Sequence, residues 1–375
     1  MFPATTLSRC LVLRQSWKHL RELYFRRDST DYQYINGGGR LFSYHNQAVL
    51  SLSHRGWSIL PERYFTSDIP KNEKDVTSED VTIGGLKRRW RKCLEEEGVP
   101  ESDLSVEAIV AHVLGKKMFH ELDASIMTLL PTKKEKEDID RLCHQRLKRM
   151  PVQYIISEWD FRDMTLIMKP PVFIPRSETE IFVEIITDHY RKDEELKILE
   201  IGCGSGAISV SLLRAFNKSH VTAFDVLKEA VELTQENAAR YNVQDRLNIY
   251  NESVSCRVPK HLENSKFQFD LIVSNPPYIF EEDLDGLEPE VIKFEDTAAL
   301  NGGRDGADVI FDIIKLSPHV LKPGGYIWLE TDTRHSDILK DWLKRHRDLS
   351  VQFVCCFPDF TDRPRFCQLQ YVGDT

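Results

Sequence analysis

Between residues 196 and 330 the apolar positions form short runs separated by longer amphipathic stretches. The runs are rich in β-branched and aromatic residues, which predicts strands over 196–201, 220–224, 247–250, 269–273 and 326–329. The intervening stretches 206–216, 227–241 and 305–320 have a helical pattern. Strands alternating with helices predict an α/β fold, a doubly wound parallel sheet. Two further apolar runs within 349–372 have no helix between them, so we expect the last strand to pair antiparallel at or near an edge.

A different pattern precedes this sheet. Three amphipathic stretches, 86–100, 101–115 and 133–150, predict a small helical domain over 79–150. Residues 151–175 hold two short apolar runs around Arg162-Asp163 and predict a β-hairpin linking that domain to the α/β domain of 176–375. A chain of 375 residues is long enough for two such domains.

The N-terminus carries a charge pattern of its own. Residues 1–27 contain six basic residues and one acid, interleaved with apolar side chains. An Arg-rich, acid-poor, amphipathic start is typical of a mitochondrial presequence, which predicts a location in the matrix. The alternative is a basic tail that binds nucleic acid or an anionic surface. Residues 28–78 have no sustained periodicity and predict a disordered linker.

Composition excludes several classes of protein. The net charge is −9 although the first 27 residues are basic, so the rest is acidic and we expect no direct contact with nucleic acid. The basic runs 87–92 and 146–150 are interpreted as solvated helix faces. No apolar run reaches the ~18 residues that a membrane span needs. The eight cysteines form no CxxC pair, which argues against a zinc site and a disulfide framework; we expect no metal.

The first strand of the sheet ends in a glycine-rich turn, Gly202-Cys203-Gly204-Ser205-Gly206, followed by a helix. Glycines there let the backbone approach a ligand at the helix N-terminus. The next strand ends at Asp225, where an acid can take a ribose hydroxyl pair. The turn also fits the dinucleotide fingerprint or a plain tight turn, and Asp225 can instead cap the following helix. Together they predict a nucleotide-like ligand.

The fourth strand runs directly into Asn275-Pro276-Pro277-Tyr278. In open α/β sheets ligands lie beyond the carboxyl ends of the strands, so this motif shares a rim with the glycine turn and Asp225. The Asn275 carboxamide and the Pro276 carbonyl can accept from a planar NH₂ group, and Tyr278 offers it a flat face. Such a site would position the nitrogen of that group, and a cofactor with a transferable methyl group would suit this geometry. The alternative is a proline-stopped strand with asparagine at a turn.

Several longer stretches narrow the assignment. "RMPVQYIISEWDF", "PPVFIPRSETE", "VSNPPYI", "FEDTAALNGGRDG" and "LKPGGYIWLE" resemble the HemK/PrmC family of release factor glutamine methyltransferases, in its mitochondrial branch. The resemblance covers about residues 81–371. It implies the class I S-adenosylmethionine-dependent methyltransferase fold, Rossmann-like with a seven-stranded, mostly parallel sheet, a small N-terminal helical domain and a linking β-hairpin.

The resemblance also implies an activity. Members methylate the side-chain nitrogen of the Gly-Gly-Gln glutamine in class I peptide chain release factors, here the mitochondrial ones, with S-adenosylmethionine as methyl donor. The helical domain would grip the release factor, and we expect a monomer.

By resemblance, Asn275, Pro276, Pro277 and Tyr278 hold the glutamine. The cofactor would lie against Gly202, Cys203, Gly204, Ser205 and Gly206, with Asp225 on its ribose and Asn275 near its methyl. Glu200, Arg176 and Thr179 would shape its methionine end, and Ser253 its adenine region.

Three positions depart from the family pattern. Ser177 stands where the family usually has proline, Ser253 stands where an acid is common, with Glu252 beside it, and "LETDTRHSD" lacks a typical Gly and Gln.

Three other functions compete with this prediction. An N6-adenine or other amino-directed nucleic-acid methyltransferase can use the same Asn-Pro-Pro-Tyr motif, but usually needs a basic recognition surface. A nicotinamide dehydrogenase leaves that motif unused. A non-catalytic partner protein has no need of both the glycine turn and Asn275.

Overall fold

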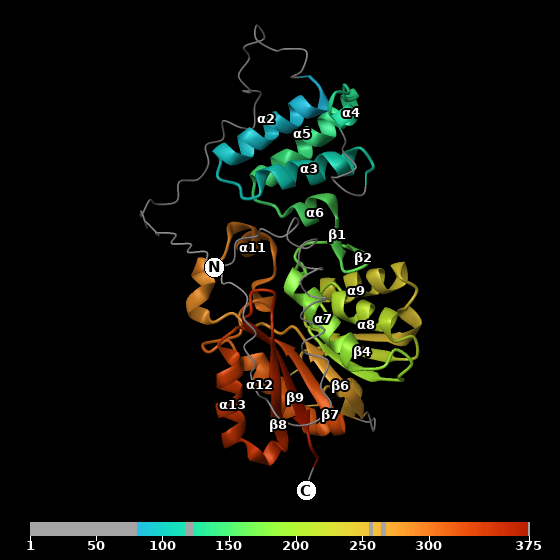
Figure 1. The fold of residues 1–375 in the computed structure, drawn as a ribbon, viewed down its shortest axis with the longest axis vertical. Coiled ribbons are helices and arrows are strands. Elements are labelled where there is room, and N and C mark those ends of the chain that lie inside the picture. The colour runs from blue at the N-terminus through green and yellow to red at the C-terminus, as the bar shows by residue number, and fades with distance from the viewer. Residues whose placement is uncertain (1–80, 117–123, 255–257, 264–267, 374–375) are drawn as a thin grey trace, which may run out of the picture.

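A computed structural model describes residues 81–116, 124–254, 258–263 and 268–373. The predicted presequence, 1–27, and linker, 28–78, lie outside the described residues. A helical unit stands above a larger α/β unit in Figure 1. None of the helices within the described ranges is long and apolar enough to cross a membrane.

The α/β unit is built on one seven-stranded sheet with the strand order β5-β4-β3-β6-β7-β9-β8. The strands β3, β4, β5, β6 and β7 pair in parallel, and β9 pairs antiparallel with both β7 and β8. All five predicted strands of the alternating region are present, and the last strand lies one position in from the edge, as expected. The bounds are Lys197–Ile201 (β3), His220–Asp225 (β4), Leu247–Asn251 (β5), Phe269–Ser274 (β6), Leu321–Glu330 (β7), Val351–Pro358 (β8) and Pro364–Tyr371 (β9).

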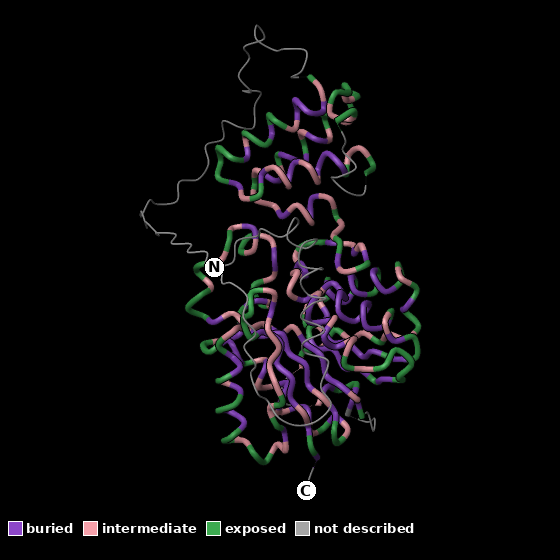
Figure 2. Tube along the Cα trace, viewed as in Figure 1, coloured by how far each residue is buried: buried purple, intermediate pink, exposed green. Residues whose placement is uncertain are grey.

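Helices cover both faces of the sheet because the central strands are apolar on both sides. In β3, Ile198 packs into one core cluster, while its neighbours Leu199 and Ile201 pack into the other, as the two-residue repeat of a strand requires. One face is covered by α7 (Ser177–His189), α8 (Ala207–Ala215) and α9 (Lys228–Arg240), the other by α12 (Asp308–Val320) and α13 (His335–Arg345). Figure 2 shows the buried positions concentrated in this sheet and its facing helices. The doubly wound, seven-stranded and mostly parallel sheet is confirmed.

The helical unit has its own apolar core, which includes Leu86, Trp90, Ile109 and Ile139. Helices form in each predicted stretch: α2 (Ile83–Glu96), α3 (Ser102–Val113) and α5 (Lys133–Leu147), with the short α4 (Ala124–Met127) beside them. A capping box between Thr132 and Glu135 starts α5.

The hairpin between the two units is shorter than the 151–175 predicted from the sequence. The first residues of that range form the short helix α6 (Val152–Ile156), and the hairpin itself is β1 (Glu158–Phe161) paired with β2 (Met164–Ile167). The helical unit also contacts α11 (Pro289–Phe294) of the α/β unit, since Arg146 and Arg149 both donate to the Glu290 carboxylate, at 2.9 and 2.8 Å. The interpretation of 146–150 as a solvated helix face is therefore wrong for these two arginines, because their charges are paired between the units.

Candidate active site

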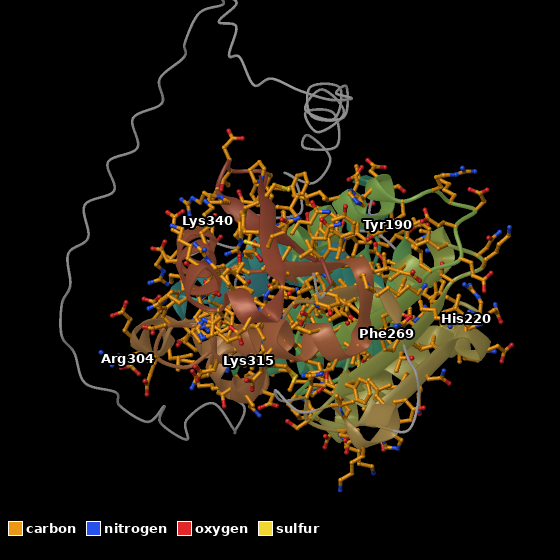
Figure 3. The ribbon with its side chains drawn as sticks, turned by 90° about the horizontal axis from the view of Figure 1, so that it is seen from below. Tyr190, His220, Phe269, Arg304, Lys315 and Lys340 are labelled. Carbon is orange, nitrogen blue, oxygen red and sulfur yellow. The ribbon has the colours of Figure 1, made fainter. Side chains whose placement is uncertain are left out.

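The carboxyl ends of β3, β4 and β6 meet at the rim that faces the helical unit. Strand β3 lies between β4 and β6, so the chain reverses its direction of travel across the sheet at this point, where open α/β sheets bind ligands. A cleft of about 2730 Å³ opens there, lined by Gly202, Asp225, Asn275 and, at its far end, Leu104 of α3. Figure 3 views the opposite end of the sheet, where His220 and Phe269 begin β4 and β6.

The glycine turn adopts a conformation that side chains oppose. Gly202, Gly204 and Gly206 have φ angles of 77°, 54° and 80°, in the left-handed region. A Cβ on Gly206 would lie 2.9 Å from Cγ2 of Thr234. Cys203 and Ser205 are buried within the turn, and burial raises the pKa of the Cys203 thiol well above its usual value. Cys203 is therefore a packing residue and no nucleophile.

Asp225 ties the turn to the start of the next helix. Its Oδ2 accepts from the Gly204 N–H and its Oδ1 from the Leu227 N–H, both at 2.9 Å. Burial raises the pKa of the carboxyl. Asp225 therefore contacts the start of the next helix and also lines the cleft. Its contact with a ribose stays a prediction.

Glu200 is a fully buried carboxyl beneath the turn. Its Oε2 accepts from the Ser209 hydroxyl, whereas Oε1 is buried and has no hydrogen-bond partner among the described residues. Burial, with a smaller effect of the Asp225 charge, raises its pKa to about 8. An acceptor of this kind in the lining of a cleft can take a ligand donor.

Ser253 and Glu252 follow β5 at the same rim. The Glu252 carboxylate is occupied, because it accepts from the Lys260 N–H at 2.7 Å and contacts Nδ1 of His261 at 2.7 Å. Ser253 is exposed in the cleft wall, so of these two neighbours its hydroxyl is the one open to a ligand. Its adenine role stays a prediction.

The Asn275-Pro276-Pro277-Tyr278 segment is held on two sides. Before it, the Ser274 hydroxyl donates to the Ile201 carbonyl at 2.6 Å, which fixes the end of β6 beside the glycine turn. After it, the Ile279 N–H donates to the Leu300 carbonyl at 3.0 Å, and the Gly302 N–H donates to the Ile279 carbonyl at 2.9 Å. The 300–306 loop, recognised in the sequence only as a family motif, is the backing of this segment.

Thr179 lies against Asn275, as part of a buried chain of polar groups. The Asn275 Nδ2 donates to Thr179 Oγ1 at 3.3 Å, and that hydroxyl donates to Oε2 of Glu330 at 2.9 Å. The Tyr278 hydroxyl donates to Oε1 of Glu330 at 3.3 Å and accepts from Arg365 at 3.2 Å. Sequence reasoning missed Glu330 and Arg365. The available signal for Glu330 was its place at the end of a predicted strand on the same rim.

Arg176 is paired within the protein. Its guanidinium donates to the buried Glu295 at 2.7 Å and lies 4.7 Å from the ring centre of Phe173. Glu295, also missed, belongs to the "FED" stretch, so this pair joins that stretch to the start of α7. A contact of Arg176 with the cofactor stays a prediction.

Two family models match this chain, one over the helical unit and one over part of the α/β unit. Residues 86–156 match the PrmC N-terminal domain family and residues 163–291 match the Methyltransferase small domain family. Among solved structures, a methyltransferase from Pyrococcus furiosus aligns with 51% of this chain and 82% of its own, at 20% identity and a TM-score of 0.36.

Curated relatives align over both units. The human MTRF1L release factor glutamine methyltransferase is 44% identical over 296 residues, which cover 77% of this chain and 87% of the relative. The release factor glutamine methyltransferase of Fusobacterium nucleatum is 33% identical over 272 residues, 72% of this chain and 74% of the relative. Both relatives exceed 30% identity over more than two thirds of their own length, and the chain belongs to the release factor glutamine methyltransferase family.

Proposed function

We propose that this protein methylates the side-chain amide nitrogen of the glutamine in the Gly-Gly-Gln motif of class I peptide chain release factors. The observation that carries the proposal is the shared rim, on which Asn275 and the glycine turn line one cleft that reaches the helical unit. Family membership supports the same substrate class.

The residues of the rim fit S-adenosylmethionine, which when bound supplies an electrophilic methyl group. Gly202, Gly204 and Gly206 have no side chain and allow close approach of the ligand. Oε1 of Glu200, which has no partner within the described ranges, can accept from an amino group. Asp225 would take the ribose hydroxyls and Ser253 would lie beside the adenine. Cys203 and Ser205 would contribute backbone, and Thr179 and Arg176 would border the methionine end.

The Asn275 segment would act on the glutamine by positioning it. A carboxamide nitrogen is a poor nucleophile because its lone pair is delocalised. Acceptance of its two hydrogens by Oδ1 of Asn275 and the carbonyl of Pro276 directs that lone pair toward the methyl group, with Pro277 and Tyr278 holding the amide plane. Exclusion of water by the protein substrate strengthens both hydrogen bonds.

The cleft also supports a protein substrate. It extends from Asn275 past α11 to the helical unit, so a release factor domain can contact both units while its glutamine enters the rim. We propose mitochondrial release factors and a matrix location on the basis of the Arg-rich, acid-poor residues 1–27, and a monomeric enzyme.

Mass spectrometry tests the proposed function. The full-length protein, S-adenosylmethionine and a purified mitochondrial class I release factor should yield a factor heavier by one methyl group on the Gly-Gly-Gln glutamine. A factor with that glutamine changed to asparagine is the control and should stay unmodified. Methyl transfer to RNA or DNA without transfer to the factor would contradict the proposal and favour the nucleic-acid methyltransferase.

A further inference from the structure

A buried hydrogen-bonded chain connects the tip of Asn275 to a carboxylate on another strand. Thr179, which is 2% exposed, stands between Asn275 and the fully buried Glu330. Thr179 comes from α7, Asn275 from the end of β6 and Glu330 from the end of β7.

While Glu330 is ionised, the hydrogen bonds from Asn275 through Thr179 to Glu330 can be donated in only one direction. A carboxylate only accepts, so the single hydroxyl proton of Thr179 is committed to Oε2 of Glu330. Toward Asn275 the hydroxyl can then only accept. Asn275 must therefore turn its Nδ2 to Thr179, which leaves its Oδ1 on the opposite branch of the carboxamide.

We propose that Thr179 and Glu330 are positioning residues that orient the Asn275 carboxamide so that its oxygen, and not its nitrogen, meets the NH₂ group of the substrate glutamine. This inference rests on the proposed function and deepens it. In the reversed orientation the NH₂ group of Asn275 would face the NH₂ group of the substrate glutamine. Both groups are donors, so the hydrogen bond that orients the substrate nitrogen would be lost.

Protonation of Glu330 allows the same hydrogen bonds to be donated in the opposite direction. A neutral carboxyl can donate to Thr179 Oγ1, which frees the threonine proton to donate to Asn275 and stabilises the turned-around carboxamide. Burial raises the pKa of Glu330 to about 7; Arg365 on β9 and the Thr179 hydroxyl oppose this rise, and Glu178 on α7 adds to it. The Tyr278 hydroxyl also faces Glu330 and opposes the rise. The productive orientation therefore holds above pH about 7 and is lost as the pH falls through it.

Kinetics of isosteric variants measure the effect on the reaction. Thr179→Val removes the hydroxyl and should lower kcat ~10-fold or more at saturating S-adenosylmethionine, beyond any change in cofactor affinity that follows from its place beside the methionine end. Thr179→Ser should rescue most of that loss. Glu330→Gln should lower kcat and remove the decline in kcat below pH about 7. Thr187→Val is the matched control, because Thr187 lies about two turns further along α7 and its hydroxyl donates to the Glu184 carbonyl of its own helix, at 3.0 Å.

Nuclear magnetic resonance of the Asn275 side chain tests the orientation without substrate. In the full-length protein with ¹⁵N-labelled asparagine, the Nδ2 resonance that disappears in Asn275→Ala should titrate near pH 7. The titration should vanish in Glu330→Gln. The titration itself is measured on the wild-type protein, and the two variants serve only to assign the resonance and to identify the titrating group.

The outcomes separate the inference from the proposed function. An Asn275 resonance that is constant between pH 6 and pH 8, one that still titrates in Glu330→Gln, or a Thr179→Val variant that loses cofactor affinity but keeps the wild-type kcat would overturn the positioning role. Absence of methyl transfer by the wild-type protein, with the Asn275 titration intact, would instead overturn the release factor substrate and support the orientation of Asn275.

Discussion

At the residue scale, Asn275 is the group on which the proposed reaction depends. Asn275→Ala should reduce methyl transfer ~100-fold or more, by analogy with the loss of one positioned donor in other active sites. Binding of S-adenosylmethionine should change little, since the glycine turn and Asp225 keep their own hydrogen bonds. Transfer of radiolabelled methyl and calorimetric titration of the cofactor measure the two effects.

The matched control for this change is Asn248→Ala. Asn248 is an exposed asparagine of β5, so its truncation should leave both quantities at wild-type values. Equal turnover of Asn275→Ala and the wild-type protein would contradict the mechanism.

The sequence predicts those site residues that belong to local motifs. Gly202 to Gly206, Asp225 and Asn275 each follow directly after an apolar strand, and the topology of parallel strands alone brings them to one rim. Glu330 also stands at the end of a predicted strand on the same rim, so its place was open to the same reasoning. Its hydrogen bond with Thr179 was not, because the two residues lie 151 positions apart in the sequence and no local pattern encodes the contact.

At the scale of elements, the 300–306 loop holds the Asn275 segment in place. Gly306 has a φ of 63°, and a Cβ there would lie 2.6 Å from the Tyr278 carbonyl oxygen. Gly306→Ala should therefore displace Tyr278, lower the melting temperature and reduce turnover. Thermal unfolding and methyl transfer measure both effects.

Gly98→Ala separates backbone strain from the contact with Tyr278. Gly98 has nearly the same φ, 66°, but a Cβ there would meet no atom within 4 Å. Each substitution carries the left-handed strain of roughly 1–2 kcal/mol. Gly306→Ala should lose more stability than this strain alone accounts for, because its Cβ also meets Tyr278. Equal losses of stability and turnover in the two variants would show that the loop does not support Tyr278.

Prediction of the elements succeeded where the hydrophobic pattern was regular. The alternating strands and helices from β3 to β7 stand close to where the pattern puts them, because the central strands β3, β4 and β6 are buried between two layers. Helices α11 and α13 were not predicted. The first is only six residues long, and the second is rich in charged residues and buries a narrow stripe that includes Leu339 and Trp342. Their positions follow from packing rather than from local sequence.

At the scale of the whole molecule, Glu290 joins the helical unit to the α/β unit. Arg146 is 4% exposed and Glu290 7%, so the pair with Arg149 is largely shielded from water. Removal of one partner from a buried ion pair costs ~3–5 kcal/mol, since the other charge is left uncompensated. Glu290→Gln should therefore destabilise the protein far more than Glu158→Gln, whose exposed pair with Arg240 is worth at most ~1 kcal/mol.

Acid should act on the same contact. Burial by itself would raise the pKa of Glu290, but the hydrogen bonds from Arg149 and Arg146 outweigh burial and hold the pKa below its usual value. A lowered pKa contributes stability above the unfolded value of about 4.3, and that stability is lost as the pH falls through the folded value. Urea unfolding at pH 7 and below pH 4 should show a loss of unfolding free energy that is smaller in Glu290→Gln than in the wild-type protein. Equal losses would mean that other carboxylates set the acid response.

Small-angle scattering at the same pH values would show whether the helical unit leaves α11 first, which is the expected order if Glu290 and its two arginines hold the cleft in shape for a protein substrate.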